Sequence, residues 1–563
     1  MEKPVWILRP RSSLAEEMSL ELGLPVEISQ IMINRGVNDP ARAHQFLYGK
    51  LADTPDPWLM KDMDKAVARI NKALAEGENI VLFGDYDVDG ILSVVMLYRF
   101  LETRGGKVSY YIPHRLEEGY GLKEKYLDVV LKRGASLVIS ADCGVKATGF
   151  VRRAKENGVE TIITDHHLPG EEIPEALAIL NPVLTDSGYP DRRLAGVGVV
   201  FKLIQALLSE KEGQESLRHY LKLVSIGTVA DVAELRGENR ILVKYGLEAL
   251  EDVSNIGLRS LLANCGLRGK RVSVGDIGYR IGPRLNAAGR MGKADLAVQL
   301  FFSSSTPATL EIVNHLEYLN SKRQQVEEKV YREALTMIKE KALDSRYRFL
   351  ILGCEDWHRG VIGIVSSKLK DSFHRPVILF SYEQDEAYGS GRSISEFSLI
   401  RFLDECRDFF INYGGHNLAA GCVILREKIK PFKEAVNKLA GDRISAEHLR
   451  RKIYLDVRLD FERLKNSFLD YYSLLSPFGV GNSRPVFMTH GVEVVSEPRL
   501  IQNKHLKFYA RQKNRTFEVL GWDRPELMSQ IEKGGIIDLA YTLHFSDYLG
   551  EKKTALSLED IRV

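Results

Sequence analysis

The stretch of residues 79–90 constrains the fold of this chain more than any other. Residues 79–84 read Asn-Ile-Val-Leu-Phe-Gly, and this short apolar run closed by a glycine predicts a buried β-strand. Asp85, Asp87 and Asp89 follow at every second position. Like charges this close raise one another's pKa, and a divalent cation with hard oxygen ligands would relieve the repulsion. A solvated acidic turn is the alternative, but open α/β sheets bind their ligands directly after such strands.

The composition is that of an ordinary soluble globular protein. With 563 residues, the chain has room for about three or four domains. The net charge is only +2, so the protein as a whole has no strong positive potential, and any surface that binds nucleic acid must be local. The first residues lack an apolar signal core, and no stretch is apolar enough to span a bilayer. Five cysteines without CxxC spacing indicate a reducing cytoplasm and no zinc site.

Further polar residues follow the other predicted strands. Short apolar runs alternate with helical segments and predict a parallel, doubly wound sheet with strands at residues 79–84, 108–113, 136–140 and 160–164. The third strand ends at Asp142, and the fourth ends at Asp165, His166 and His167. Because parallel strands align their carboxyl ends, we expect these side chains to converge with Asp85 on one edge of the sheet.

A further acidic residue ends the run of residues 223–232. This run repeats the pattern of apolar and small residues and ends at Asp231. An unpaired buried carboxylate is costly, so a buried Asp231 would need a partner, and a metal ion is the obvious one. A helix cap is the alternative interpretation.

These residues belong to an ordered set of motifs that continues along the chain. The motifs are residues 85–90 (Asp-Tyr-Asp-Val-Asp-Gly), 140–144, 164–167, 227–231, 282–290 (Gly-Pro-Arg-Leu-Asn-Ala-Ala-Gly-Arg), 357–363, 390–393 and 414–416. The set resembles the DHH phosphoesterase superfamily over about residues 50–425, and within it the bacterial single-strand-specific 5′→3′ exonucleases. Smaller members of the superfamily carry a histidine at the end of the first strand. Residues 83–85 read Phe-Gly-Asp here, which favours the exonuclease branch.

The resemblance implies the fold class: an α/β protein whose parallel-sheet DHH phosphoesterase domain is joined by a long helix to a second α/β domain, with a C-terminal OB-fold β-barrel. Helical spacing of apolar residues over 309–341 predicts the long helix, and five short strands after residue 450 suit a small barrel. We expect a helical lead-in at 1–50 with a core that includes Leu20, a catalytic domain at 51–305, a linker helix at 306–345, a nucleic-acid-binding domain at 346–449 and the OB-fold domain at 450–563.

The resemblance also implies a metal site and a reaction. Two divalent ions about 3.5–4 Å apart would be held by the catalytic residues Asp85, Asp87, Asp142, His166 and Asp231, with Asp142 as the bridge. An imidazole ligand argues for Mn²⁺, although Mg²⁺ is an option. One ion would activate a water and the other would polarise the scissile phosphate. These ligands would be held in place by Asp89, Asp165 and the catalytic residue His167. The sequence leaves open which of the two histidines, His166 or His167, binds the metal.

Residues further along the chain are expected to contact DNA. By resemblance, Arg284, Ser390 and Arg392 fit a pocket for a terminal 5′-phosphate, and the same motifs contribute Asn286, Arg290, His358, Gly415 and His416. From residue types alone, a phosphate loop at 390–393 is only slightly favoured over a structural turn. Residues 504–517 interleave cations with aromatic rings, including Lys507 and Arg511, as single-strand binders do. A solvated hairpin with its rings in the barrel core is the alternative.

The resemblance predicts a metal-dependent exodeoxyribonuclease that degrades single-stranded DNA from the 5′ end in DNA repair and recombination. The alternatives are a phosphodiesterase for short oligonucleotides or cyclic dinucleotides and a scaffold that has lost catalysis, but none of the five ligands is missing. The partners implied are single-stranded DNA, a single-stranded-DNA-binding protein and a helicase. We expect a monomer that does not contact membranes.

Overall fold

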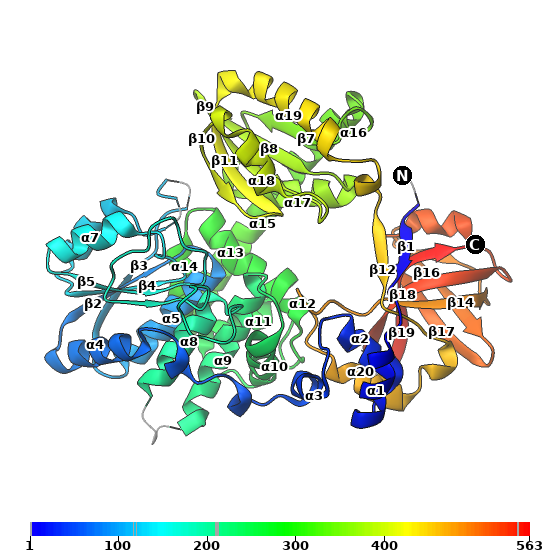
Figure 1. Cartoon of the computed structure of the whole chain (residues 1–563), viewed down its shortest axis with the longest axis horizontal. Helices are drawn as coiled ribbons and strands as arrows, with labels where there is room; N and C mark the ends of the chain where they lie inside the picture. The colour runs from blue at the N-terminus through cyan, green and yellow to red at the C-terminus, as the bar shows by residue number, and fades with distance from the viewer. Residues whose placement is uncertain (1–2, 116, 120, 209–212, 549–550) are drawn as a thin grey trace.

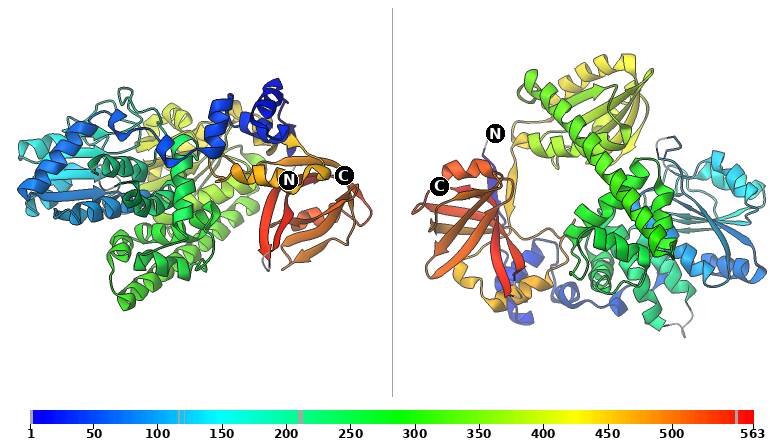
Figure 2. Two further views of the ribbon diagram at one scale, coloured as in Figure 1. Left: turned by 90° about the horizontal axis from the view of Figure 1, so that it is seen from below. Right: turned by 180° about the vertical axis from the view of Figure 1, so that it is seen from behind.

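The computed structural model of the protein describes residues 3–115, 117–119, 121–208, 213–548 and 551–563. Figure 1 shows three bodies: a blue-to-green α/β domain, a yellow-green α/β domain and an orange-red barrel. The views in Figure 2 show the long green helix that joins the two α/β domains. No helix in the described ranges is both long and apolar enough to cross a bilayer.

The first domain is built on a five-stranded parallel sheet in the order β3-β2-β4-β5-β6. Its strands are β2 (Asn79–Gly84), β3 (Lys107–Tyr111), β4 (Leu137–Ala141), β5 (Glu160–Thr164) and β6 (Ala178–Leu180). The four predicted strands are present, with bounds shifted by two residues at most, and β6 was not predicted. β2 and β4 are buried on both faces, as the continuous apolar runs require.

Helices cover both faces of this sheet and form two cores, one with α5 and α8 and one with α6 and α7. The helices of the domain are α4 (Met63–Glu76), α5 (Val88–Glu102), α6 (Leu127–Lys132), α7 (Thr148–Glu156), α8 (Gly196–Leu207), α9 (Gly213–Ala230), α10 (Gly237–Ala249), α11 (Ile256–Asn264), α12 (Val274–Asp276), the π-helical turn η4 (Ile277–Ile281), α13 (Gly282–Arg290) and α14 (Ala294–Phe302). Residues 223–230 lie in α9, so the run that ends at Asp231 is helical, unlike the apolar runs that form the strands of the sheet. Gly227 lets helix α9 pack closely against Val197 of α8, and periodicity alone cannot separate such a buried helix from a buried strand.

Helix α15 (Thr306–Glu340) joins the two α/β domains, and its 35 residues span about 52 Å. The second domain has a sheet in the order β10-β11-β9-β8-β7, in which only β7 and β8 are parallel. Its elements are α16 (Leu343–Arg346), β7 (Leu350–Cys354), α17 (Arg359–Phe373), β8 (Val377–Glu383), β9 (Glu386–Arg392), α18 (Leu399–Glu405), β10 (Phe410–Gly415), β11 (Ala419–Leu425) and α19 (Ile429–Arg443). Residues 390–392 therefore belong to a strand and not to the tight loop that was expected.

The C-terminal domain is a barrel with strand order β13-β14-β18-β19-β17-β16-β15, and an additional β14–β16 pairing closes it. Its elements are β13 (Val457–Arg458), α20 (Asn466–Leu474), β14 (Phe487–Val494), β15 (Arg499–Ile501), β16 (His505–Gln512), β17 (Arg515–Gly521), β18 (Ile536–Tyr548) and β19 (Glu551–Arg562). The five predicted strands correspond to β14 and β16–β19. β13 and β15, of two and three residues, are too short to leave a periodic signal.

The N-terminal helices are part of the barrel's core and not a separate unit. They are α1 (Ser13–Leu22), α2 (Val26–Ile33) and α3 (Pro40–Tyr48), and Met18, Ile28 and Ile31 are buried in one cluster with barrel residues. The expected core residue Leu20 is 85% exposed, because α1 buries the face of Ala15 and Met18 instead. Strand β1 (Val5–Leu8) pairs in parallel with the connecting strand β12 (Lys452–Leu455).

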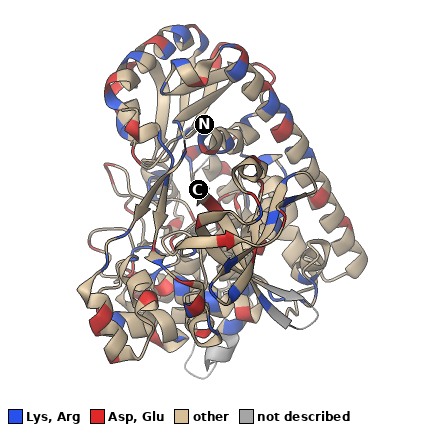
Figure 3. Cartoon of the chain, turned by 90° about the vertical axis from the view of Figure 1, so that its right-hand side faces the viewer, with Lys and Arg blue, Asp and Glu red and all other residues tan. Residues whose placement is uncertain are grey.

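One arginine fixes the barrel to the first domain. Arg240 at the start of α10 is 3% exposed and donates to the backbone carbonyls of residues 46 and 474–477, at distances of 2.8–3.3 Å. Nearby, the Leu235 amide donates to the Val480 carbonyl. Figure 3 shows basic and acidic residues interspersed over the ribbon, in keeping with the small net charge.

Candidate metal centre

The register of the parallel strands brings the aspartates together. Gly84, Ala141 and Thr164 are neighbours across β2, β4 and β5. The next residue of each strand is an aspartate: Asp85, Asp142 or Asp165. The ladder continues through them, because the Asp85 amide donates to Ala141 and the Asp142 amide donates to Thr164. The three carboxyl groups therefore emerge side by side at the carboxyl edge of the sheet, as the sequence predicted.

The next two aspartates of the first motif are held by helix starts. Asp87 caps α5 by accepting from the amides of residues 89 and 90. Asp89 accepts from the Gly196 and Val197 amides, both at 2.7 Å, at the start of α8. A Cβ on Gly196 would lie 2.8 Å from Asp142, so the glycine lets α8 approach. Burial, with the Asp87 charge, raises the pKa of Asp89 to about 7.

His166 points one ring nitrogen at the carboxylates. Its Nε2 lies 3.1 Å from Asp142 Oδ1, 3.8 Å from Asp89 Oδ2 and 3.9 Å from Asp231 Oδ2. Burial and the neighbouring His167 charge lower the pKa of His166 to about 4, so its ring is neutral at pH 7. Within the described ranges Nε2 has no hydrogen-bond partner, and a backbone hydrogen bond at Leu194 is left to Nδ1. The Nε2 lone pair then faces carboxylate oxygens, which is favourable only with a cation between them.

His167 is arranged differently from its neighbour. Its Nδ1 lies 2.8 Å from Asp165 Oδ1, and Asp165 also accepts from the amides of Val145, His166 and His167. Burial alone would lower the pKa of His167, but the hydrogen bond to Asp165 together with the charges of Asp165, Asp231 and Asp87 outweighs burial and raises the pKa to about 9. The ring is therefore charged at pH 7, and a charged imidazole offers no lone pair to a metal. The sequence left open which of these two histidines binds the metal. In the structure His166 has the geometry of a metal ligand, and His167 has that of a hydrogen-bond donor.

Asp231 reaches the cluster from the end of α9. Three groups of possible ligands have atoms within 4.8 Å of one another: Asp85, Asp87 and Asp142; Asp89, His166 and Asp231; and Asp142, His166 and His167. Asp142 occurs in two of them and holds a left-handed φ of 62°, a strained conformation of the kind that gathers at functional sites. Asp89, which was expected only to support the ligands, lies as close to His166 as Asp231 does.

The residues fit a divalent cation. Burial is the main cause that raises the pKa of Asp85, Asp142 and Asp231 well above the usual carboxyl value, and neighbouring carboxylates add to it. The Oδ1 atom of Asp85 and Nε2 of His166 are buried without a hydrogen-bond partner among the described residues. Carboxylate oxygens with one imidazole suit Mn²⁺ and, less well, Mg²⁺. A metal would neutralise the crowded charges and occupy the unpartnered atoms.

Arginines gather where α13 meets the second domain. Arg290 Nη1 donates to the Gly360 carbonyl at 3.0 Å. Its pKa is lowered to about 9 by burial and then by the charges of Arg115, Arg323 and Arg392. Arg392 on β9 lies 3.4 Å from Ser390 Oγ. In the part of the chain that the structure describes, no carboxylate accepts a hydrogen bond from Arg290. Crowded, desolvated guanidinium groups of this kind attract a phosphate.

Arg284 does not share this position. It lies on α13 rather than in a glycine loop, and its guanidinium binds Glu317 at 2.6 Å, Asn264 and the Arg280 carbonyl. Its charge is therefore already matched, and Arg290, at the far end of the same helix, is the arginine beside Arg392. The expected pairing of Arg284 with Arg392 is replaced by one of Arg290 with Arg392.

The other expected DNA contacts have varied surroundings. Asn286 Oδ1 accepts from the Val88 amide at 3.3 Å, next to the candidate metal ligands, and His358 caps α17 through the Gly360 amide. Gly415 and His416 are exposed at the end of β10.

Two cations expected to bind DNA from the barrel are already paired with glutamates. Lys507 forms a salt bridge with Glu518, and Arg511 lies 2.8 Å from Glu493. Phe508 is buried in the barrel, as the alternative interpretation of that hairpin had it. The basic stretch is therefore less available to a phosphate backbone than its sequence suggested.

Two arginines of the cluster were missed or given little weight from the sequence. Arg115 follows β3 at the same sheet edge as the aspartates, and its guanidinium lies 4.8 Å from the Tyr86 ring centroid. With His114 it forms a basic pair after a predicted strand, which on its own is only a weak signal for a phosphate contact. Arg323 lies within α15, where a charged residue in a long helix gives no such signal.

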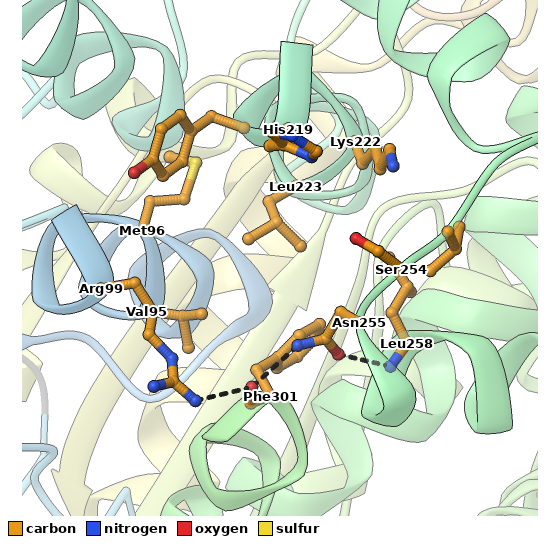
Figure 4. Close-up of a pocket in the computed structure, with 12 residues that line it drawn as sticks. Val95, Met96, Arg99, His219, Lys222, Leu223, Ser254, Asn255, Leu258 and Phe301 are labelled. Atoms are coloured by element: carbon orange, nitrogen blue, oxygen red, sulfur yellow. Dashed lines mark hydrogen bonds between the residues drawn. The ribbon is translucent and has the colours of Figure 1, made fainter. Parts of the chain in front are cut away.

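A cavity of about 240 Å³ lies elsewhere in the first domain (Figure 4). Apolar side chains line much of it: Val95, Met96, Leu223, Leu258 and Phe301. Arg99 at its edge lies twelve residues beyond Asp87 along α5, or about 18 Å. The cavity is therefore remote from the candidate metal ligands, and the carboxylate cluster remains the candidate site.

Protein-family descriptions match three parts of the chain. The DHH family N-terminal domain matches residues 79–228, the DHHA1 domain matches residues 346–442, and the RecJ OB domain matches residues 455–560. These segments lie in the first α/β domain, the second α/β domain and the barrel. The fold expected from the sequence is thereby confirmed.

Relatives match nearly the whole chain. The single-stranded-DNA-specific exonuclease RecJ of Bacillus subtilis (strain 168) is 33% identical over 560 residues, which cover 99% of this chain and 70% of the relative. That of Escherichia coli (strain K12) is 32% identical over 88% of each chain. The crystal structure of RecJ in complex with Mn²⁺ from Thermus thermophilus has a TM-score of 0.84 at 30% identity, and the match covers 99% of this chain and 79% of that one. The chain belongs to the RecJ family of the DHH phosphoesterases.

Proposed function

We propose that this protein is a metal-dependent exonuclease that hydrolyses single-stranded DNA from the 5′ end. The observation that carries the proposal is the cluster of buried carboxylates and the neutral His166 at one sheet edge. The names of the relatives, which describe single-stranded-DNA-specific exonucleases, and the Mn²⁺ and Mg²⁺ complexes of the Thermus thermophilus protein support it.

The metal ligands in this proposal are the set expected from the sequence: Asp85, Asp87, Asp142, His166 and Asp231. Asp142 and His166 each belong to two of the three candidate groups, and Asp142 is the bridge because a carboxylate has two oxygens to offer to two ions, whereas the His166 ring has one free nitrogen. Asp89, with both oxygens bound by α8 amides, holds α8 against the site. Two bound divalent ions would lower the pKa of a coordinated water and polarise the scissile phosphate.

His167 supplies a fixed positive charge beside these ligands. Asp165 holds its Nδ1 and keeps the ring charged at pH 7. A charged imidazole at this point stabilises negative charge that develops on the phosphate and can donate a proton to a leaving oxygen. Asp165 is therefore a positioning residue that acts through His167.

The arginines on either side of the domain boundary would read the 5′ end. A terminal phosphate carries an extra charge and an extra oxygen compared with an internal diester. Arg290, Arg392 and Ser390, with Arg115 nearby, offer several donors in one desolvated place. Charge-assisted bonds from such a set favour the terminal phosphate over an internal one, and this preference sets the polarity of degradation.

End-labelled strands test the proposal directly. Single strands carrying a label at the 5′ or the 3′ end are incubated with the protein and Mn²⁺, with chelator as the control. We expect immediate release of the 5′ label, gradual shortening of the 3′-labelled strand, and no cleavage with chelator. Matched RNA and duplex strands test the preference for single-stranded DNA. Shortening from the 3′ end, or cleavage that chelator does not affect, would refute the proposal.

A further inference from the structure

A pocket of about 440 Å³ lies beside the arginines that gather at the domain boundary. It is formed by the end of β3, the turn after α13 and the start of α14, and we call it the β3–α14 pocket. Pockets that bind small molecules usually have volumes of about 300–1,000 Å³, and the cavity in Figure 4, at about 240 Å³, falls below that range. No candidate metal ligand is among the described residues that line the β3–α14 pocket.

The β3–α14 pocket begins at the arginines proposed to read the 5′ end. Arg115 lines the pocket, and burial together with the Arg115 charge lowers the pKa of both Arg290 and Arg392. Gly289 also lines the pocket and directly precedes Arg290 on α13. A phosphate bound by these arginines therefore lies at the edge of the pocket.

Tyr86 separates this pocket from the candidate metal ligands. It stands between Asp85 and Asp87 in the chain. The Arg115 guanidinium lies 4.8 Å from the centroid of its ring, and a Cβ on Gly289 would lie 3.7 Å from the Tyr86 Cβ. A strand with its scissile phosphate at the aspartates and its terminal phosphate at the arginines therefore has the pocket beyond its terminal phosphate.

Contacts around the pocket hold its walls in place. Gly292 has a φ of +72°, and a Cβ at this position would lie 2.0 Å from His114 Nε2. The glycine thus lets the turn after α13 pack against the loop after β3. In that loop, Glu118 accepts hydrogen bonds from the Tyr111 hydroxyl at 2.9 Å and from the His114 amide. The loop that carries Arg115 is therefore fixed on both sides.

Two cations of the pocket are available to phosphate oxygens. Within the described ranges, neither Arg115 nor Lys293 pairs with a carboxylate. Lys293 also stands at the start of α14, where no described side chain caps the helix. An unpaired guanidinium and an unpaired ammonium group beside helix amides favour a phosphate group.

The rest of the lining suits a nucleoside. Glu118 and Asp295 offer carboxylate acceptors for sugar hydroxyls, and the Tyr110 hydroxyl holds Asp295 at 2.6 Å. Ile112 and Leu296 add an apolar wall against which a base can pack. The pocket therefore combines partners for phosphates with partners for a nucleoside.

We propose that the β3–α14 pocket binds a nucleotide joined through a pyrophosphate link to the 5′ phosphate of a single strand, such as the adenylyl group of a 5′-adenylated strand. This proposal rests on the exonuclease function above and extends its substrates to strands with a blocked 5′ end. Adenylyl transfer to a 5′ phosphate is the class of reaction that supplies such strands. Without the pocket, the group beyond the terminal phosphate would have no room and the strand would resist degradation.

Cleavage of such a strand needs no additional chemistry. Water attacks the phosphorus of the diester between the first and second nucleotides, the bond from this phosphorus to the 3′ oxygen of the first nucleotide breaks, and that oxygen takes a proton. The pyrophosphate link stays intact. The products are adenosine joined through pyrophosphate to the first nucleotide and a shortened strand that carries a 5′ phosphate.

Strands of one sequence with different 5′ ends test the proposal. A 5′-adenylated, a 5′-triphosphorylated and a 5′-phosphorylated strand are each incubated with the protein and Mn²⁺. We expect the wild type to degrade the adenylated strand with a KM no higher than that of the phosphorylated strand. Mass spectrometry should identify the intact adenylated nucleotide as the first product. The triphosphorylated strand, which lacks the nucleoside, should have a higher KM than the adenylated strand.

Substitutions in the pocket should affect only the blocked strand. Lys293→Ala should raise the KM of the adenylated strand by about 10-fold, which corresponds to the loss of one charged hydrogen bond, and leave that of the phosphorylated strand unchanged. His315→Trp places a large ring in the pocket from α15 and should raise the same KM. Lys132→Ala removes an exposed lysine of α6 and is the matched control. Fluorescence anisotropy of 3′-labelled strands in chelator measures the same losses without turnover, and melting temperatures verify that the variants are folded.

Four results would overturn the inference while the proposed function stands. They are a wild type that degrades phosphorylated but not adenylated strands, a first product that has already lost the adenylyl group, equal KM values for the adenylated and triphosphorylated strands, and a wild-type KM for the adenylated strand in both pocket variants. Failure of the wild type to degrade phosphorylated single strands would instead refute the proposed function.

Discussion

Replacing Asp142 with asparagine should make the metal-free protein more stable and greatly reduce its stabilisation by Mn²⁺. Asp142 belongs to two of the candidate metal groups, and burial with neighbouring carboxylates raises its pKa. Asparagine keeps the size of the side chain and tolerates the left-handed φ of 62° at this position. The substitution therefore removes charge with little change in packing.

The size of the effect follows from the geometry of the cluster. The ligand atoms of Asp85, Asp87 and Asp142 lie within 4.8 Å of one another. Two unit charges at that distance repel by about 3.5 kcal/mol at an effective dielectric constant of about 20. Proton uptake relieves part of this repulsion in the wild type. We therefore expect the free energy of unfolding of Asp142→Asn to be about 2–3 kcal/mol higher, which corresponds to about 4–12 °C in the melting temperature of a domain of this size.

The pH of the assay decides whether the gain is visible. The pKa of Asp89 is raised from 3.8 to about 7. When folding raises the pKa of a carboxyl group, the folded state binds its proton more tightly than the unfolded state does. The resulting stabilisation is complete at pH values below the unfolded-state pKa and is lost as the pH rises through the folded-state pKa, here about 7. Metal-free wild type should therefore lose stability between about pH 4 and pH 7, and the comparison with Asp142→Asn belongs at pH 8.

Thermal melting at pH 8 with and without Mn²⁺ provides the measurement. At Mn²⁺ concentrations one hundred times the Kd, wild type should gain about 2.7 kcal/mol per site, and Asp142→Asn should gain much less. Asp128→Asn, an exposed carboxyl group on α6, is the control and should behave as wild type. An Asp142→Asn protein that melts no higher than wild type in chelator and responds normally to Mn²⁺ would refute the reasoning.

Three further predictions concern the surroundings of the site. Arg392→Ala should lower the preference for 5′-phosphorylated over 5′-hydroxyl strands in steady-state rates, with partial recovery in Arg392→Lys; an unchanged preference would place the end-reading pocket elsewhere. Asp165→Asn should lower the pKa of His167 from about 9 towards its usual value, as NMR titration of the ring would show, and a pKa that stays near 9 would contradict the role of Asp165. Lys202→Met should destabilise the protein by about 3–5 kcal/mol in denaturant unfolding, because it leaves Glu238 buried without the partner now 2.9 Å away; a loss below about 1 kcal/mol would contradict this.

The sheet and its aspartates could be predicted from the sequence because local patterns encode them. Strand β2 is a continuous apolar run, and the parallel register that follows from such strands places Asp85, Asp142 and Asp165 side by side. The spacing of residues 85–90 also has a local cause: Asp87 caps α5, and a Cβ on Gly90 would lie 2.6 Å from the Asp85 amide.

Features that depend on distant contacts could not be predicted in this way. The N-terminal helices pack on a barrel more than 400 residues later, and nothing in their own pattern names that partner. The family resemblance suggested a phosphate site at Arg284, but Glu317 on α15 already pairs with this arginine. The different roles of His166 and His167 likewise depend on their partners: His166 has a backbone hydrogen bond at Leu194, whereas His167 has the carboxylate of Asp165.

Anomalous diffraction from crystals soaked in Mn²⁺ tests the central claim most directly, because it locates the ions without reference to activity. We expect two peaks about 3.5–4 Å apart at the carboxyl edge of the sheet, with Asp142 bound to both ions and His166 bound to one through Nε2. The same soak of Asp142→Asn should lose at least one peak. A single ion away from Asp142, or no ion within this cluster, would contradict the two-metal account.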